Sequence, residues 1–208
     1  MSETVIFFYN LWQITTWSLL IVLTLFYILV DPLCQEHQSP YDTNPIWRLF
    51  LWTAQGTQVV DILLSAIGAT KNSILTVFPQ IFSRLYVMFV IFPSIADDKR
   101  FLIAFVIMFW GLSEMVRFLF YTIRGNATIG WLRYNLFTVV QPSSVLTELY
   151  CIWSAYSKVT AIENATDRPW TVLMPNLVNF ELHFELTVWV AVFLFVFGTP
   201  QIYMHLLS

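Results

Sequence analysis

Residues 11–30, LWQITTWSLLIVLTLFYILV, are twenty consecutive residues without an acidic or basic side chain, and Asp31-Pro32 follows directly. A helix that crosses the hydrocarbon core of a bilayer needs about 20 predominantly apolar residues. A signal peptide would be a shorter apolar stretch after basic residues, whereas the residues before this stretch include Glu3 and neither Lys nor Arg. The stretch therefore predicts a retained membrane-spanning helix.

The composition of the whole chain agrees with a membrane protein. Of 208 residues, 58% are hydrophobic and 11% are charged, whereas roughly a quarter of the residues in soluble domains are charged. Aromatic residues make up 18% of the chain, which suits the Trp and Tyr belts found at membrane interfaces. This composition excludes a soluble enzyme and a disordered linker. The net charge of -3 provides no basic surface for a nucleic acid, so we expect membrane lipids and no nucleic acid among the partners.

Further apolar stretches follow the first one along the chain. The predicted spans are residues 11–30, 46–68, 74–95, 101–123, 131–156 and 182–207, and a long connection with Pro169 and Pro175 precedes the last of them. The sequence thus predicts an all-α, polytopic membrane protein. We expect residues 1–208 to form a single transmembrane domain of about six helices in one bundle.

Six charged side chains lie along the predicted spans, inside their outermost residues: Asp61, Arg84, Glu114, Arg117, Arg133 and Glu148. Each costs roughly 2.5 to 3.5 kcal/mol at bilayer depth, so each should pair or line a cavity. Glu114 and Arg117 are three residues apart and can pair on one helix. Arg133 lies near a helix end and can reach the headgroups. Asp61, Arg84 and Glu148 have no local partner, and for them we favour a shared interior site over scattered contacts between helices.

Metal and phosphatase chemistry find no support in the sequence. His37, His183 and His205 do not have the spacing of metal ligands, so we expect no metal site and no cofactor. Neither Cys34 nor Cys151 has an Arg six residues later. A phosphatase nucleophile with its phosphate-binding arginine is therefore not expected.

Polar and aromatic motifs follow one another in a particular order along most of the chain. They are Tyr9-Asn10, Gln13 and Trp17; Thr57-Gln58, Gly68, Ser73, Gln80 and Ser83-Arg84; Trp110, Glu114, Arg117 and Tyr121; Leu132-Arg133-Tyr134 and Phe137; Pro142 and Glu148; and Pro200, Tyr203 and His205. Their order and spacing resemble the very-long-chain (3R)-3-hydroxyacyl-CoA dehydratase family, also called protein-tyrosine-phosphatase-like proteins. The resemblance implies a multi-pass protein of the endoplasmic reticulum membrane that removes water from long-chain 3-hydroxyacyl-CoA to give trans-2-enoyl-CoA. It also implies a place among the fatty acid elongation enzymes.

The same resemblance indicates the site residues. The family motif Tyr-Pro-x-Gly-x-x-x-Glu corresponds here to residues 141–148, QPSSVLTE. Glu148 therefore matches the catalytic Glu, while Gln141 stands at the catalytic Tyr position and Ser144 at the Gly position. The supporting polar residues of the family correspond to Gln80, Arg84 and Arg133, which match, and to Asp61, where the family usually has Glu.

The change at position 141 leaves two functions open. Dehydration needs a base for the C2 proton and an acid for the leaving hydroxyl, and the amide of Gln141 can be neither. One such group typically contributes about 10² to 10⁴ in rate. The first hypothesis is a lyase with altered or weak catalysis, in which Glu148 is the ionisable catalyst, Gln141 orients substrate or water, and Arg84 and Arg133 hold the thioester or the CoA phosphates. The alternative is a catalytically inactive relative that binds acyl-CoA or scaffolds the elongation complex.

Overall fold

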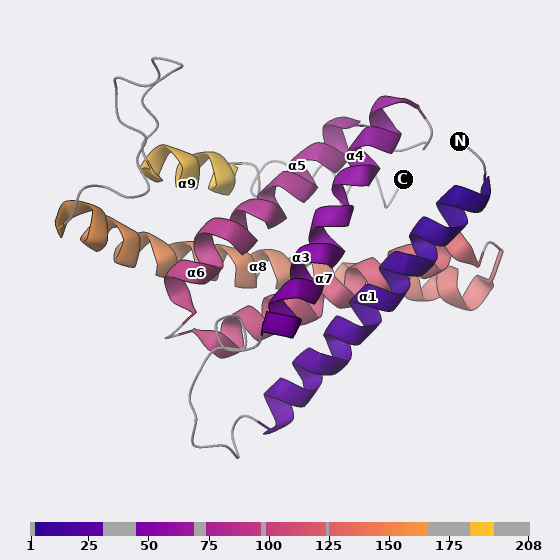
Figure 1. The fold of residues 1–208 in the computed structure, drawn as a ribbon, viewed down its shortest axis with the longest axis horizontal. Helices are drawn as coiled ribbons and strands as arrows, with labels where there is room; N and C mark the ends of the chain where they lie inside the picture. The colour runs from indigo at the N-terminus through magenta and orange to yellow at the C-terminus, as the bar shows by residue number, and fades with distance from the viewer. Residues whose placement is uncertain are drawn as a thin grey trace.

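The computed structural model describes residues 3–30, 45–68, 74–96, 99–123, 125–165 and 184–193. Throughout these ranges the regular structure is helical (Figure 1). The elements are α1 (Glu3–Val30), α3 (Pro45–Thr57), α4 (Val59–Ala66), α5 (Ile74–Tyr86), the π-helical turn η2 (Val87–Ile91), α6 (Phe92–Ile95), α7 (Arg100–Thr122), α8 (Ala127–Ala165) and α9 (Phe184–Phe193). The all-α prediction is therefore confirmed.

Three of the described helical segments are long and apolar enough to cross a membrane: Thr4–Val30, Val77–Ile95 and Arg100–Thr122. They coincide with the predicted spans at 11–30, 74–95 and 101–123. Along α1, large apolar side chains such as Phe8, Val22, Phe26 and Leu29 are exposed, as expected for a surface that faces lipid. The chain is a membrane protein.

The predicted span at 46–68 is not one helix. Helix α3 ends at Thr57 and α4 begins at Val59. At this break the backbone N–H of Gln58 donates to the backbone carbonyl of Gln55 at 3.2 Å, and the backbone N–H of Asp61 donates to the backbone carbonyl of Gln58 at 2.8 Å. These bonds reach back only three residues, so the chain forms a tighter turn at a point that is rich in polar side chains.

The predicted span at 131–156 lies within α8, which is 39 residues long and contains Pro142. Residues 157–165 belong to this helix, although we predicted them as the beginning of a connection. At 1.5 Å per residue α8 is about 58 Å long, nearly twice the hydrocarbon thickness of about 30 Å. The helix therefore tilts strongly or continues beyond the hydrocarbon. Residues 31–44, residues 166–181 and most of the last predicted span lie outside the described residues.

The helices share one hydrophobic core. Helix α1 packs against α7, and α7 packs against α8, while α6 and η2 also contact α8 (Figure 1). Fully buried Trp17, Trp47, Phe92, Trp110 and Phe118 fill much of the space between the helices. Helix α5 contacts α4 and η2, and ion pairs join α4 and α5 to α7. The polar residues of the site thus come together from α4, α5, α7 and α8.

Candidate functional site

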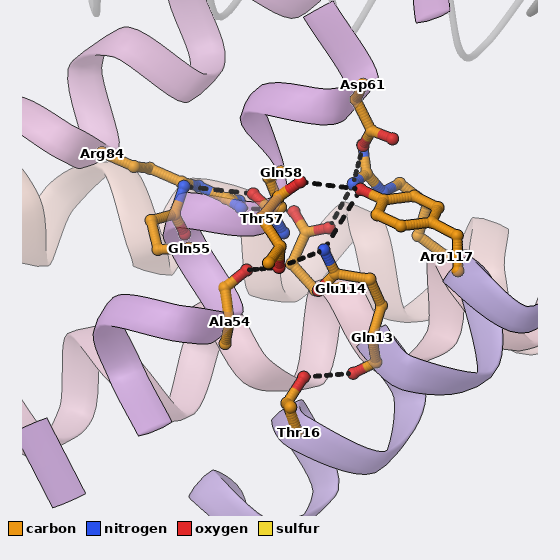
Figure 2. Close-up of polar contacts among 11 residues, drawn as sticks. Gln13, Thr16, Ala54, Gln55, Thr57, Gln58, Asp61, Arg84, Glu114 and Arg117 are labelled. Atoms are coloured by element: carbon orange, nitrogen blue, oxygen red, sulfur yellow. Dashed lines mark hydrogen bonds and ion pairs between the residues drawn. The ribbon is translucent and has the colours of Figure 1, made fainter. Parts of the chain in front are cut away.

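Four charged side chains from three helices form one network of ion pairs (Figure 2). Arg117 on α7 places Nη2 2.8 Å from an Asp61 oxygen and 2.7 Å from Glu114 Oε2. The other Glu114 oxygen, Oε1, accepts a hydrogen bond from Arg84 Nη1 on α5. The local pair predicted between Glu114 and Arg117 is confirmed, but it is also connected to both neighbouring helices. Opposite charges thus compensate one another inside the bundle.

Uncharged polar groups surround this network on the side of α1 and α3. Gln13 Nε2 donates to Thr57 Oγ1 at 3.0 Å and to the Tyr9 hydroxyl at 3.1 Å. Gln55 Nε2 donates to Gln58 Oε1 at 3.1 Å. All three Gln side chains are buried, and Figure 2 shows them gathered around the ion pairs. The break between α3 and α4 therefore supplies much of the polar lining.

Glu148 occupies a separate position on α8. Its Oε1 accepts a hydrogen bond from Trp110 Nε1 at 2.7 Å and another from Ser144 Oγ at 2.6 Å. The residue is only 3% exposed. Its second oxygen, Oε2, is buried and has no hydrogen-bond partner within the described part of the chain. One carboxylate oxygen is therefore held by two donors, and the other is left without a donor among the described residues.

Arg84 connects the ion network to Glu148. Its guanidinium carbon lies 5.6 Å from the centroid of the Trp110 ring, within the range of a cation–π contact. The positive charge of Arg84 also acts on the Glu148 carboxyl group. The structure thus brings Asp61, Arg84 and Glu148, which have no local partner in the sequence, into one buried polar region through Glu114, Arg117 and Trp110.

The remaining predicted site residues lie at the margins of this region. Gln80 is one helical turn before Arg84 on α5 and is half-buried, as is Gln141, which lies two turns before Glu148 on α8. Among the described residues Arg133 lies apart from the ion network: its guanidinium carbon lies over the rings of Phe120 and Tyr121, at 4.4 and 5.2 Å from their centroids.

Two partners in the site were missed by sequence reasoning: the indole of Trp110, which binds Glu148, and Arg117 as the partner of Asp61. Trp110, Glu114 and Arg117 have the spacing i, i+4, i+7, which places them on one face of α7. Gln141, Ser144 and Glu148 share a face of α8 through the spacing i, i+3, i+7. This periodicity indicates which residues act together on each helix.

A family model described as protein tyrosine phosphatase-like protein, PTPLA, matches residues 55–208, a stretch that contains every residue of the ion network and Glu148. The chain belongs to this family. Despite the phosphatase in the name of the PTPLA family, Cys151 is fully buried in the hydrophobic core here. Its position agrees with the absence of a phosphatase motif around it.

Several curated proteins are similar to this PTPLA chain. The very-long-chain (3R)-3-hydroxyacyl-CoA dehydratase PASTICCINO 2 of Arabidopsis thaliana is 26% identical over 164 residues, covering 76% of this chain and 72% of the relative. The very-long-chain (3R)-3-hydroxyacyl-CoA dehydratase 1 of Mus musculus is 28% identical over 211 aligned residues, covering 96% of this chain and 69% of the relative. No solved structure matches the chain.

Proposed function

We propose that this protein is a very-long-chain 3-hydroxyacyl-CoA dehydratase with altered catalysis. The relatives from Arabidopsis thaliana and Mus musculus carry this activity in their names. The observation that carries the proposal is the state of Glu148, a buried carboxyl group with Oε1 held by two donors and Oε2 left without a partner among the described residues. A buried, oriented carboxyl group with one available oxygen suits general acid–base catalysis.

The reaction breaks the C2–H and C3–O bonds of the substrate and forms the C2–C3 double bond and water. In this proposal Glu148 accepts the C2 proton and returns a proton to the departing hydroxyl, so a single carboxyl group closes the proton balance. Gln141 lies two turns away on the same helix and offers an amide that donates and accepts hydrogen bonds. It orients the substrate or a water molecule and carries no proton itself.

The arginines hold the polar end of the substrate. Arg84 lies over the ring of Trp110, whose N–H binds Glu148, and it is 4% exposed, which suits a contact with the thioester carbonyl next to the reacting carbons. Arg133 is half-buried over two aromatic rings, and in this proposal it holds the CoA phosphates. Asp61 and Gln80 support the site from α4 and α5. We further propose that residues 1–208 form one multi-pass domain of six helices in the endoplasmic reticulum membrane, next to other elongation enzymes.

Gln141 supports a second candidate function. Because an amide cannot replace an ionisable phenol in proton transfer, a chain with this residue fits a catalytically inactive relative that binds acyl-CoA or scaffolds the elongation complex.

Turnover of a long-chain 3-hydroxyacyl-CoA by the purified protein in lipid nanodiscs tests the proposal. The comparison includes the unchanged protein, Glu148→Ala, Gln141→Tyr, and Ser143→Ala as a control on the same helix. We expect slow turnover by the unchanged protein and none by Glu148→Ala. Ser143→Ala should keep the rate within about twofold of the unchanged protein, and Gln141→Tyr should raise it by about 10²-fold or more.

The dehydratase proposal fails if the unchanged protein turns over no faster than Glu148→Ala. Activity that arises only in Gln141→Tyr would support the inactive relative, since it would show that the substrate binds and that only the proton-transfer group is missing.

A further inference from the structure

Trp110 is the point at which four helical elements of the site meet. The residue is on α7 and fully buried. Its ring stacks on Phe92 of α6, with 5.7 Å between the centroids, and the guanidinium of Arg84 from α5 lies over it. Its Nε1–H donates to Glu148 on α8. A single side chain therefore contacts both the arginine and the carboxyl group of the site.

The orientation of Glu148 depends on contacts from outside its own side chain. The terminal torsion of a Glu side chain has only broad preferences, so the carboxyl plane is not defined by its rotamer. Ser144 donates from one turn earlier on α8 and positions the carboxyl group relative to its own helix. Trp110 donates from α7 and positions it relative to the rest of the bundle. Oε1 accepts both hydrogen bonds, so the two donors together fix the position of Oε2.

We propose that Trp110 is a positioning residue for the dehydration, which holds Glu148 so that Oε2 faces the substrate and holds Arg84 on its ring beside it. This inference rests on the proposed function. Phe92 stacks on the ring, and Glu114 holds Arg84 through an ion pair. The indole therefore sets the relative placement of the proton-carrying group and of the cation that binds the thioester.

Trp110→Phe removes the N–H donor while it keeps an aromatic ring for Phe92 and Arg84. Trp17→Phe is the matched control, because Trp17 is also fully buried and its Nε1 has no hydrogen-bond partner among the described residues. We expect Trp110→Phe to lower kcat about 10- to 100-fold, in line with the loss of a hydrogen bond to a charged group. KM should stay within about twofold, and Trp17→Phe should keep kcat within about twofold.

The effect must also depend on Glu148. If Trp110 acts through this carboxyl group, then the losses of turnover in Trp110→Phe and Ser144→Ala, which remove the two donors to the same Glu148 oxygen, are not additive in the double variant, since residues that act as a unit are not additive. Unchanged kcat in Trp110→Phe would overturn the inference, as would an equal loss of kcat in Trp17→Phe.

A second measurement keeps the test independent of turnover. The indole N–H signals of the 9 tryptophans are recorded by ¹⁵N-edited NMR, and the Trp110 signal is assigned by its loss in Trp110→Phe. We expect that signal to move in Glu148→Ala and to stay in place in Ser143→Ala. If the Trp110 signal does not move in Glu148→Ala, the positioning role is overturned, whether or not the protein turns over the substrate. A signal that responds in a protein without turnover supports the positioning role and counts against the dehydratase proposal alone.

Discussion

Arg117 on α7 binds Asp61 on α4 across 56 residues of sequence, with 2.8 Å between Nη2 and Oδ2. The same nitrogen lies 2.7 Å from Oε2 of Glu114, three residues earlier on α7. A guanidinium presents several donors in a planar fork, so it can bind two carboxylates at once. One side chain thus joins a local ion pair to a distant one, and it ties α4 to α7 at the level of the site.

Asp61→Ala should lower the free energy of unfolding by about 1–3 kcal/mol, because it removes a charged hydrogen bond while Glu114 still compensates Arg117. The side chains of Arg117 and Asp61 are 18% and 14% exposed, which keeps the cost below that of a fully buried pair. Denaturant unfolding in micelles measures the change in the free energy of unfolding. In a double-mutant cycle with Arg117→Ala, additive effects of the two changes would show that the pair contributes nothing.

Glu114→Gln should be more damaging than Asp61→Ala, because Glu114 binds both Arg84 and Arg117. Breaking a buried ion pair by removal of one partner costs about 3–5 kcal/mol, and Glu114 is only 1% exposed. The same unfolding measurement compares the two variants. A smaller loss in Glu114→Gln than in Asp61→Ala would contradict the central place of Glu114 in the network.

Gly111→Ala should separate α1 from α7. A Cβ at Gly111 would lie 2.7 Å from Cγ1 of Ile21, whereas a Cβ at Gly56 would meet nothing within 4 Å. We expect a loss of about 1–3 kcal/mol in Gly111→Ala from overpacking, and no such loss in Gly56→Ala, where the added methyl group enters open space in the last turn of α3. Ile21→Ala should partly restore the stability of Gly111→Ala, and thermal unfolding in detergent checks all three. Equal stabilities of the two alanine variants would rule out the close contact.

Ser144→Ala should reduce dehydratase turnover about 10-fold, because it removes one of the two donors that hold Glu148 Oε1. Ser143→Ala is the neighbouring control, since the Ser143 hydroxyl donates to the Val139 carbonyl at 2.9 Å within α8. Turnover at saturating substrate compares the two variants. Equal rates in both would mean that Ser144 does not position the carboxyl group.

Helix α7 shows how far local sequence predicts this fold. Its predicted span, 101–123, differs by one residue at each end from the observed helix, Arg100–Thr122. The chain leaves the helical conformation at Ile123 (φ -105°, ψ 75°), and Gly125 follows at φ 82°, a conformation that glycine adopts without steric cost. The ends of an apolar stretch that is bounded by charged residues and glycine can be predicted from the sequence. Helix α8 has no such boundary near Tyr156. The predicted span ends there because the apolar stretch ends, but the polar residues that follow are compatible with a helix and continue it.

By itself the sequence determined that the chain is helical and lies in a membrane, because an apolar stretch of about 20 residues without charge has a low free energy only there. It also determined the pair of Glu114 and Arg117, which helical spacing alone brings together. The tertiary structure decided that Arg84 binds Glu114, 30 residues away, and that Trp110 binds Glu148, 38 residues away. Periodicity places a residue on a face of its helix, but only the packing of the helices decides which face lies opposite.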